Sequence, residues 1–108
     1  MIAGGGTTYN IQTGNFTASF GTSYLCDVEG GAITATLPAS PGAGDDGKSI
    51  EFVKSDPALG GNTLTLGRNG ETIMDSAADM DIEASDGENI TIKAIWDDTA
   101  NTWKIAVG

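Results

Sequence analysis

Apolar and polar residues alternate along most of this chain. In residues 32–37, Ile33, Ala35 and Leu37 are apolar and the threonines between them are polar. Successive side chains of a β-strand point to opposite faces of its sheet, so this period of two predicts a half-buried strand. The same pattern predicts strands around Leu25 and in 48–54, 62–68, 79–84, 89–97 and 101–108. Helical signal is limited to one turn at 76–80.

Turn residues separate these runs. Residues 29–31 read "EGG" and favour a tight hairpin between the first two strands, while 68–70 contain Asn-Gly and 85–87 contain Asp-Gly, both strong hairpin signals. Residues 97–101 predict a longer loop between the last two strands. Seven or eight short strands at this spacing indicate an all-β fold, an antiparallel β-sandwich or a jelly-roll-like small barrel.

The first 16 residues differ from the rest, with three consecutive glycines and only scattered apolar residues. We expect residues 1–16 to form an extended N-terminal arm and 17–108 to form a single β-sandwich domain. An ordinary frayed terminus is the alternative interpretation. If the segment is an arm, its apolar side chains are candidate anchors that dock on another subunit as an added strand, namely Ile2, Tyr9, Ile11 and Phe16.

Several residues of the strands are candidates for the core. Cys26 is the single cysteine, which rules out an internal disulfide, and its apolar neighbours predict a buried thiol. Trp96 and Trp103 flank one loop on adjacent strands, which predicts a cross-strand packing pair. In 48–54, Ile50 and Phe52 share one face, and the pattern assigns Lys48 and Lys54 to the strand ends.

The charge balance narrows the classes of partner. The 108 residues fit one domain and include 15 acidic and 5 basic residues, a net charge of −10. Without a Lys/Arg cluster, neither nucleic acid nor an anionic membrane surface is an expected partner, whereas a cationic surface is compatible. No apolar run approaches the roughly 20 residues of a spanning helix. The start "MIAGGGTTYN" lacks a signal peptide, so synthesis in a reducing cytosol is expected.

The chain has little catalytic apparatus. It contains no histidine, which excludes Ser-His-Asp and Cys-His sites and leaves zinc with a poor ligand set. Asp79, Asp81 and Glu83 share one strand face, where two of them could form a carboxylate pair like that of a glycosidase. Such a pair needs one desolvated acid, and a solvated strand face explains three acids more simply. No catalytic residue is predicted, and the chain is not expected to be an enzyme.

Two loops carry letters that suggest ligands. Residues 42–49 read "GAGDDGKS" and match the phosphate-loop pattern. A phosphate loop requires a preceding parallel strand and a following helix, whereas 48–54 alternate as a strand and two aspartates would repel phosphate. Residues 45–47 and 97–101 gather oxygen donors without calcium-loop spacing, which leaves at most a weak surface ion. No cofactor or metal is predicted.

The prolines that follow the strand at 32–37 are interpreted as a stop. Pro38 has no N–H and cannot continue a central ladder, and Pro41 stiffens the crossing toward the next strand. Because this loop lies at the end of a strand without a reactive residue, Pro38 and Pro41 are expected to contribute to subunit contacts.

The stretch 24–45, "YLCDVEGGAITATLPASPGAGD", resembles a pattern of tailed-phage virion proteins, including tail-fibre modules and small capsid decoration (cement) proteins. In that pattern a "YLVDTSGG" strand leads to "TVTLPASPAAGD" and then to a strand like "SIEFVK". The later segments "LTLGRNGETI", "DMDIE" and "NTWKI" continue the resemblance, which covers residues 23 to 104. "CDV" in place of "VDT" and the longer "GDDGKSI" link depart from the pattern.

The resemblance implies a β-rich, non-enzymatic bacteriophage structural protein, usually a homotrimer. Because the chain starts at Met1 and shows no fibre shaft, a capsid decoration protein is expected, on the outer surface of the virion capsid and bound to the major capsid protein at subunit junctions. The alternative is a receptor- or glycan-binding tail-fibre or tip module. Under either interpretation the candidate contact residues remain Ile2, Tyr9, Ile11, Phe16, Pro38 and Pro41.

Overall fold

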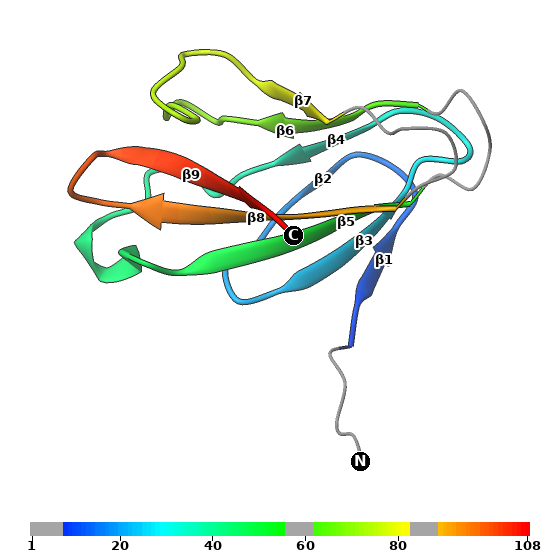
Figure 1. Ribbon diagram of the computed structural model, residues 1–108, viewed down its shortest axis with the longest axis horizontal. Coiled ribbons are helices and arrows are strands. Elements are labelled where there is room, and N and C mark those ends of the chain that lie inside the picture. Colours follow the sequence, from blue (N-terminus) through cyan, green and yellow to red (C-terminus); the bar gives the residue numbers. More distant parts are fainter. Residues whose placement is uncertain (1–7, 56–61, 83–88) are drawn as a thin grey trace.

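Two mixed β-sheets make up the protein in the computed structural model, which describes residues 8–55, 62–82 and 89–108 (Figure 1). The five-stranded sheet has the order β1-β3-β5-β8-β9. Its strands are β1 (Asn10–Gln12), β3 (Ser23–Asp27), β5 (Ser49–Ser55), β8 (Ile90–Asp97) and β9 (Thr102–Val107). The four-stranded sheet has the order β2-β4-β6-β7, with β2 (Phe16–Thr17), β4 (Ile33–Thr36), β6 (Leu64–Gly67) and β7 (Met80–Ile82). Neither sheet closes into a barrel.

The first six strands alternate between the two sheets, so the chain winds as a flattened coil. As a result, β1, β3 and β5 pair in parallel in one sheet, and β2, β4 and β6 pair in parallel in the other. Only the last three strands pair antiparallel, β7 with β6, β8 with β5, and β9 with β8. The all-β prediction is confirmed, but the expectation of antiparallel sheets is wrong for the coil. The period of two is the same in both kinds of ladder and does not distinguish them.

The turn at residues 29–31 does not form the predicted hairpin. It carries the chain from β3 to β4, which belong to different sheets. Within the turn the Gly31 N–H donates to the Val28 carbonyl at 3.2 Å, and the Glu29 N–H donates to the Asp27 carboxylate at 3.0 Å. Glycine and aspartate favour tight turns of several kinds, so these letters predicted the turn correctly but not the strand that it leads to.

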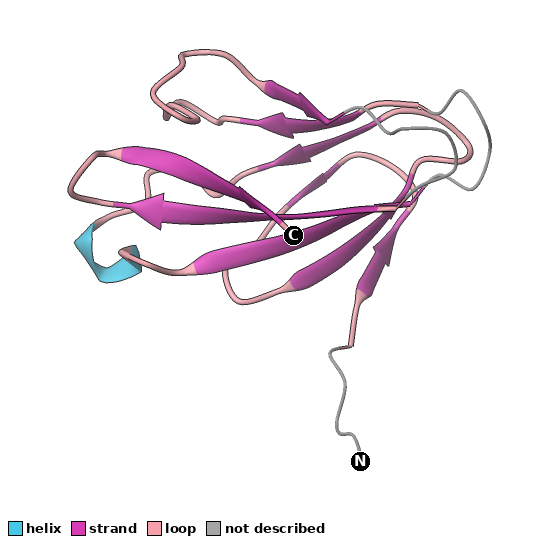
Figure 2. Cartoon of the chain, in the orientation of Figure 1, coloured by secondary structure: helices cyan, strands magenta, loops and turns pink. Residues whose placement is uncertain are grey.

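The other predicted turns have mixed outcomes. The loop after Asp97 joins β8 to β9 as predicted. Asn69 and Gly70 adopt left-handed backbone angles, with φ of 50° and 91°, but a long segment follows them before β7 pairs with β6. Residues 76–80 form no helix; the only helical turn in the described ranges is a 3₁₀ turn at Ala43–Asp45 (Figure 2). The turn predicted at 85–87 lies outside the described residues.

The core lies between the sheets and is continuous. Its buried apolar side chains come from both sheets, and Trp96 and Trp103 are fully buried among them. These two residues face each other across β8 and β9, with ring centroids 5.4 Å apart in an edge-on arrangement, which confirms the predicted pair. Phe20 stacks on the other side of Trp103 at 5.4 Å. The aromatic cluster therefore fixes the hairpin of β8 and β9 against the loop before β3.

The outer edge of β9 is covered by the segment that follows Gly70. The Trp103 N–H donates to the Thr72 carbonyl at 2.9 Å, and the Met74 N–H donates to the Trp103 carbonyl at 2.8 Å. Further along the strand, the Ile105 N–H donates to the Met74 thioether at 3.3 Å. These contacts occupy much of the backbone at an edge that another strand could otherwise join.

Candidate functional site

An aliphatic row crosses the outer face of the five-stranded sheet. Ile11, Leu25 and Val53 are direct cross-strand partners on β1, β3 and β5, so their side chains form one line. Ile11 is 67% exposed, and Leu25 and Val53 are half-buried. All three point away from the core, since their neighbours Tyr24, Cys26 and Phe52 are buried. No other element in the described part of the chain forms a layer over these three apolar side chains.

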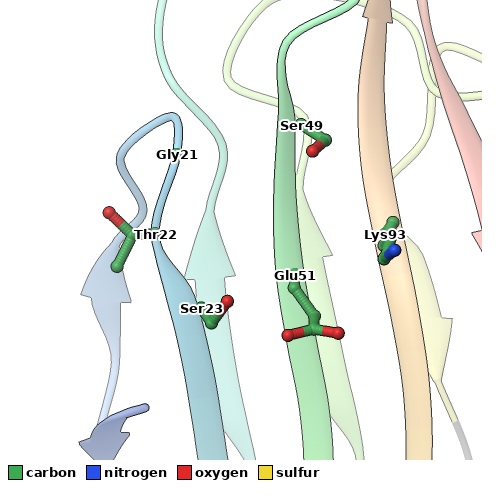
Figure 3. Close-up of a pocket in the computed structure, with 6 residues that line it drawn as sticks. All are labelled: Gly21, Thr22, Ser23, Ser49, Glu51 and Lys93. Carbon is green, nitrogen blue, oxygen red and sulfur yellow. The ribbon is translucent and has the colours of Figure 1, made fainter. Parts of the chain in front are cut away.

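A polar hollow of about 280 Å³ lies next to the aliphatic row. It is lined by Gly21, Thr22, Ser23, Ser49, Glu51 and Lys93, which come from β3, β5, β8 and the loop before β3 (Figure 3). Glu51 and Lys93 are direct partners across β5 and β8. Their charged groups nevertheless form no ion pair with each other. The one ion pair among the described residues joins Lys48 and Asp45. The carboxylate and the amine therefore do not neutralise each other within the chain.

Tyr9 extends this polar surface beyond β3. Its hydroxyl has a pKa above the ordinary value, mainly because it hydrogen-bonds to Glu51 and also because of desolvation and the Glu51 charge. A second hollow of about 460 Å³ adjoins the first and is lined by Phe20, Gly21, Gly47, Lys48 and Ser49. The two hollows make the outer face of the sheet uneven beside the aliphatic row.

The charge of this outer face differs from that of the remaining molecule. Its ionisable strand residues are three acids and two bases, net −1, namely Asp27, Glu51, Asp97, Lys93 and Lys104. The remaining described residues carry eight acids and three bases, net −5. The opposite sheet presents mostly threonines, with the exposed Asp81 accepting a hydrogen bond from the Thr65 hydroxyl at 2.7 Å. Among the described residues, most of the net negative charge therefore lies outside the outer side of the five-stranded sheet.

The described members of the acidic row Asp79, Asp81 and Glu83 do not form a glycosidase-like carboxylate pair. Asp79 is exposed and accepts a hydrogen bond from the Arg68 N–H at 2.9 Å, and Asp81 is exposed on β7. Glu83 lies outside the described residues. The described carboxylates of this group are solvated and take part in local hydrogen bonds, which supports the interpretation of a solvated strand face.

The two aspartate-rich loops lie together. The Asp98 N–H donates to the Asp46 carboxylate at 2.9 Å, and the Gly47 N–H donates to the Trp96 carbonyl at 2.8 Å. The pKa of Asp45 is lowered chiefly by a hydrogen bond from the Gly42 N–H and further by Lys48. Across residues 8–55, 62–82 and 89–108, no group of three or more ligating side chains is arranged to hold a metal ion. The phosphate-loop letters run directly into β5, a strand where a helix would be required.

The six predicted contact residues are not gathered at one place. Tyr9 and Ile11 lie at the five-stranded face described above. Phe16 belongs to β2, and its ring packs 4.7 Å from that of Tyr24 within the same chain. Pro38 and Pro41 are half-buried in the loop that follows β4, and Ile2 lies outside the described residues. The expected boundary between arm and domain, after residue 16, falls inside β2.

Four residues of this face, Leu25, Val53, Glu51 and Lys93, were not predicted as site residues. For two of them, the alternation of apolar and polar residues already contained the necessary information. Leu25 and Val53 are apolar residues at positions that the period of two assigns to the outer side of their strands. An apolar residue on the polar side of a strand is the pattern from which an uncovered surface could have been predicted.

Cys26 is inert in the folded protein. It is fully buried on β3, and burial raises the pKa of its thiol to about 12. Because the thiolate is the reactive form, we expect native protein at about pH 8 to remain unmodified by iodoacetamide, whereas the urea-unfolded chain is alkylated once. Mass spectrometry of the two samples measures this difference. Equal alkylation rates would contradict a buried, protonated thiol.

Lys54 is the least expected residue of the core. It shares the inward side of β5 with Ile50 and Phe52, and its exposed fraction is 0%. Its amine has no hydrogen-bond partner among the described residues. The direct cross-strand neighbours of Lys54 are Cys26 and Ile90, which offer an amine little polar contact. The sequence pattern assigns Lys54 to a strand end, and β5 does end one residue later, at Ser55, but the side chain lies in the core.

Comparison with known protein families finds no matching family model, and comparison with curated proteins finds no similar sequence. None of the helical structure in the described ranges is long and apolar enough to cross a membrane.

Proposed function

We propose that this protein is a non-enzymatic structural protein of a tailed-phage virion, a small capsid decoration protein. In this proposal it assembles as a homotrimer on the outer capsid surface and binds the major capsid protein at junctions between subunits. Neither nucleic acid nor membrane is a partner. Its contribution is buried contact area repeated over many copies, which opposes separation of the capsid subunits.

The observation that carries the proposal is that the segments resembling virion proteins pack together as one unit. The Leu37 N–H donates to the Gly67 carbonyl at 2.8 Å, and the Asn69 side-chain amide donates to the Leu37 carbonyl at 3.0 Å. These contacts join the "TLPASP" and "LTLGRNGETI" segments in the four-stranded sheet. The resemblance therefore involves residues that build the fold, as expected for a shared structural module.

The proposal also includes the finer fold description. Two sheets that enclose one core agree with a β-sandwich, and residues 1–16 serve as an arm that reaches a neighbouring subunit. β1 and the first residue of β2 lie within this arm, and their parallel pairing with β3 and β4 fixes it against both sheets.

A comparison of virions with and without the protein tests this function. Particles that lack it should melt at lower temperature, and adding the purified protein should restore the melting temperature. Differential scanning calorimetry of both particles measures the effect. Equal melting temperatures, together with no binding of the purified protein to the undecorated particles, would overturn the proposal.

The polar hollow favours one alternative function, a receptor- or glycan-binding module of a tail fibre. Three hydroxyl side chains, a carboxylate and an amine line it, and Phe20 lies in the adjoining hollow. Binding on a glycan array, lost in Glu51→Gln, and labelling of the tail by immunogold would favour this alternative over capsid decoration.

A further inference from the structure

We infer that the outer face of the five-stranded sheet is the surface on which a second copy of this chain docks. The inference goes beyond the proposed homotrimer, because two copies that meet through the same face form a two-fold contact, and it does not rest on the proposed function. Three features of this face support a second copy as its occupant: apolar side chains without cover, local charge balance and a complementary acid–base pair.

The aliphatic row supplies the apolar contact. Ile11, Leu25 and Val53 align across three adjacent strands, and Ile11 is among the most exposed large apolar residues described, at 67%. Burial of such a row gains roughly 25 cal/mol for each Å² removed from water. A row that crosses three adjacent strands is an extended apolar surface, which suits association with another folded domain.

The distribution of charge over the molecule favours a second copy as the partner of this face. The whole chain has a net charge of −10, so two copies repel each other over most orientations. The five-stranded face carries a net −1 from its described strand residues, against −5 for the other described residues. Docking on this face avoids the like-charge contacts that other surfaces would produce. A cationic partner would instead be drawn to the acidic surfaces of the molecule.

Glu51 and Lys93 provide complementarity between copies. They are adjacent on β5 and β8, yet their charged groups are not paired within the chain. Lys93 is exposed, and Glu51 is half-buried beside Tyr9. A surface on which an acid and a base are adjacent but form no ion pair with each other can meet the same surface of another copy with the two charges exchanged.

The edge of the same sheet is a poorer site for association. Backbone groups at Trp103 and Ile105 are already bonded to Thr72 and Met74, which limits addition of a strand along β9. At the other edge, β1 spans only Asn10–Gln12, a short template for strand pairing. The sheet face therefore remains the more extensive free surface of this half of the molecule.

The test measures the mass of the purified full-length chain by sedimentation velocity over a range of concentrations. Wild type should form oligomers, and Ile11→Asp should weaken association at least roughly tenfold, because it places an unpaired charge in the contact. Thr17→Asp is the matched control, since it adds the same charge to an exposed position on the edge strand of the other sheet. Circular dichroism confirms that both variants are folded.

A charge exchange sharpens the test. Lys93→Glu should also weaken association, and adding Glu51→Lys to it should restore association. A monomeric wild-type chain at every concentration, or equal weakening by Ile11→Asp and Thr17→Asp, would overturn the inference. Because this readout needs no virion, oligomers that dissociate with Ile11→Asp but do not stabilise particles would instead contradict the decoration function.

Discussion

Replacement of Trp103 by alanine should lower the free energy of unfolding by about 3–5 kcal/mol, the usual cost of removing a large aromatic side chain from a core. Trp103 is fully buried and contacts Trp96 on one side and Phe20 on the other, each at a centroid distance of 5.4 Å. Its backbone also anchors the segment that covers β9. Loss of the ring should therefore loosen both the hairpin and the covering segment.

Urea denaturation followed by fluorescence and circular dichroism measures this change. Val107→Ala is the matched control, because Val107 lies on the same strand and side but is 77% exposed, and substitutions at such positions usually change stability by no more than about 0.5 kcal/mol. If the two variants had similar midpoints and slopes, Trp103 would not be the packing centre that its contacts indicate.

Lys54→Met is expected to stabilise the protein, by about 1–3 kcal/mol. The amine is fully buried and lacks a hydrogen-bond partner among the described residues, so folding removes it from water without evident compensation. Methionine keeps a similar length and flexibility and fills the same space with apolar atoms. The inward side of β5 would then be apolar from Ile50 to residue 54.

The same denaturation experiment tests this substitution, with Lys104→Met as the control for removing a positive charge. Lys104 is half-buried on the outer side of β9. A gain for Lys54→Met that exceeds the effect of the control is the expected result. A loss of stability specific to Lys54→Met would show that the amine has a favourable partner in the folded protein.

The strands themselves were predictable, because alternation depends on the contrast between the two sides of a sheet. All seven runs marked by period two contain a strand, and the tryptophan pair follows from the loop that separates its members. The side of the sheet that Lys54 occupies was also predictable, since Lys54 lies an even number of residues from Ile50 and Phe52. Its assignment to a strand end did not use this parity, which predicts a buried position for a residue type that is usually exposed.

The pairing of the strands was not predictable in the same way. A turn such as 29–31 specifies a local change of direction, and nothing within it selects a partner in the same sheet or the opposite one. That choice depends on the parallel contacts of β3 with β5 and of β4 with β6, which form between residues far apart in the sequence. The uncovered face resulted from this pairing, since only the register aligns Ile11, Leu25 and Val53.

The flattened coil also has a consequence for the rate at which the protein folds. Ser23 pairs with Glu51 and Ile33 with Leu64, so each turn of the coil closes a long loop before its contacts are gained. Folds dominated by such non-local pairs reach the native state in milliseconds to seconds, slower than helical domains of similar size. Among the described strands, β8 and β9 are the one pair of hydrogen-bonded neighbours joined by a short turn, so they can form locally. During synthesis β8 and β9 emerge after the other described strands, so β5 stays without its antiparallel partner β8 until then.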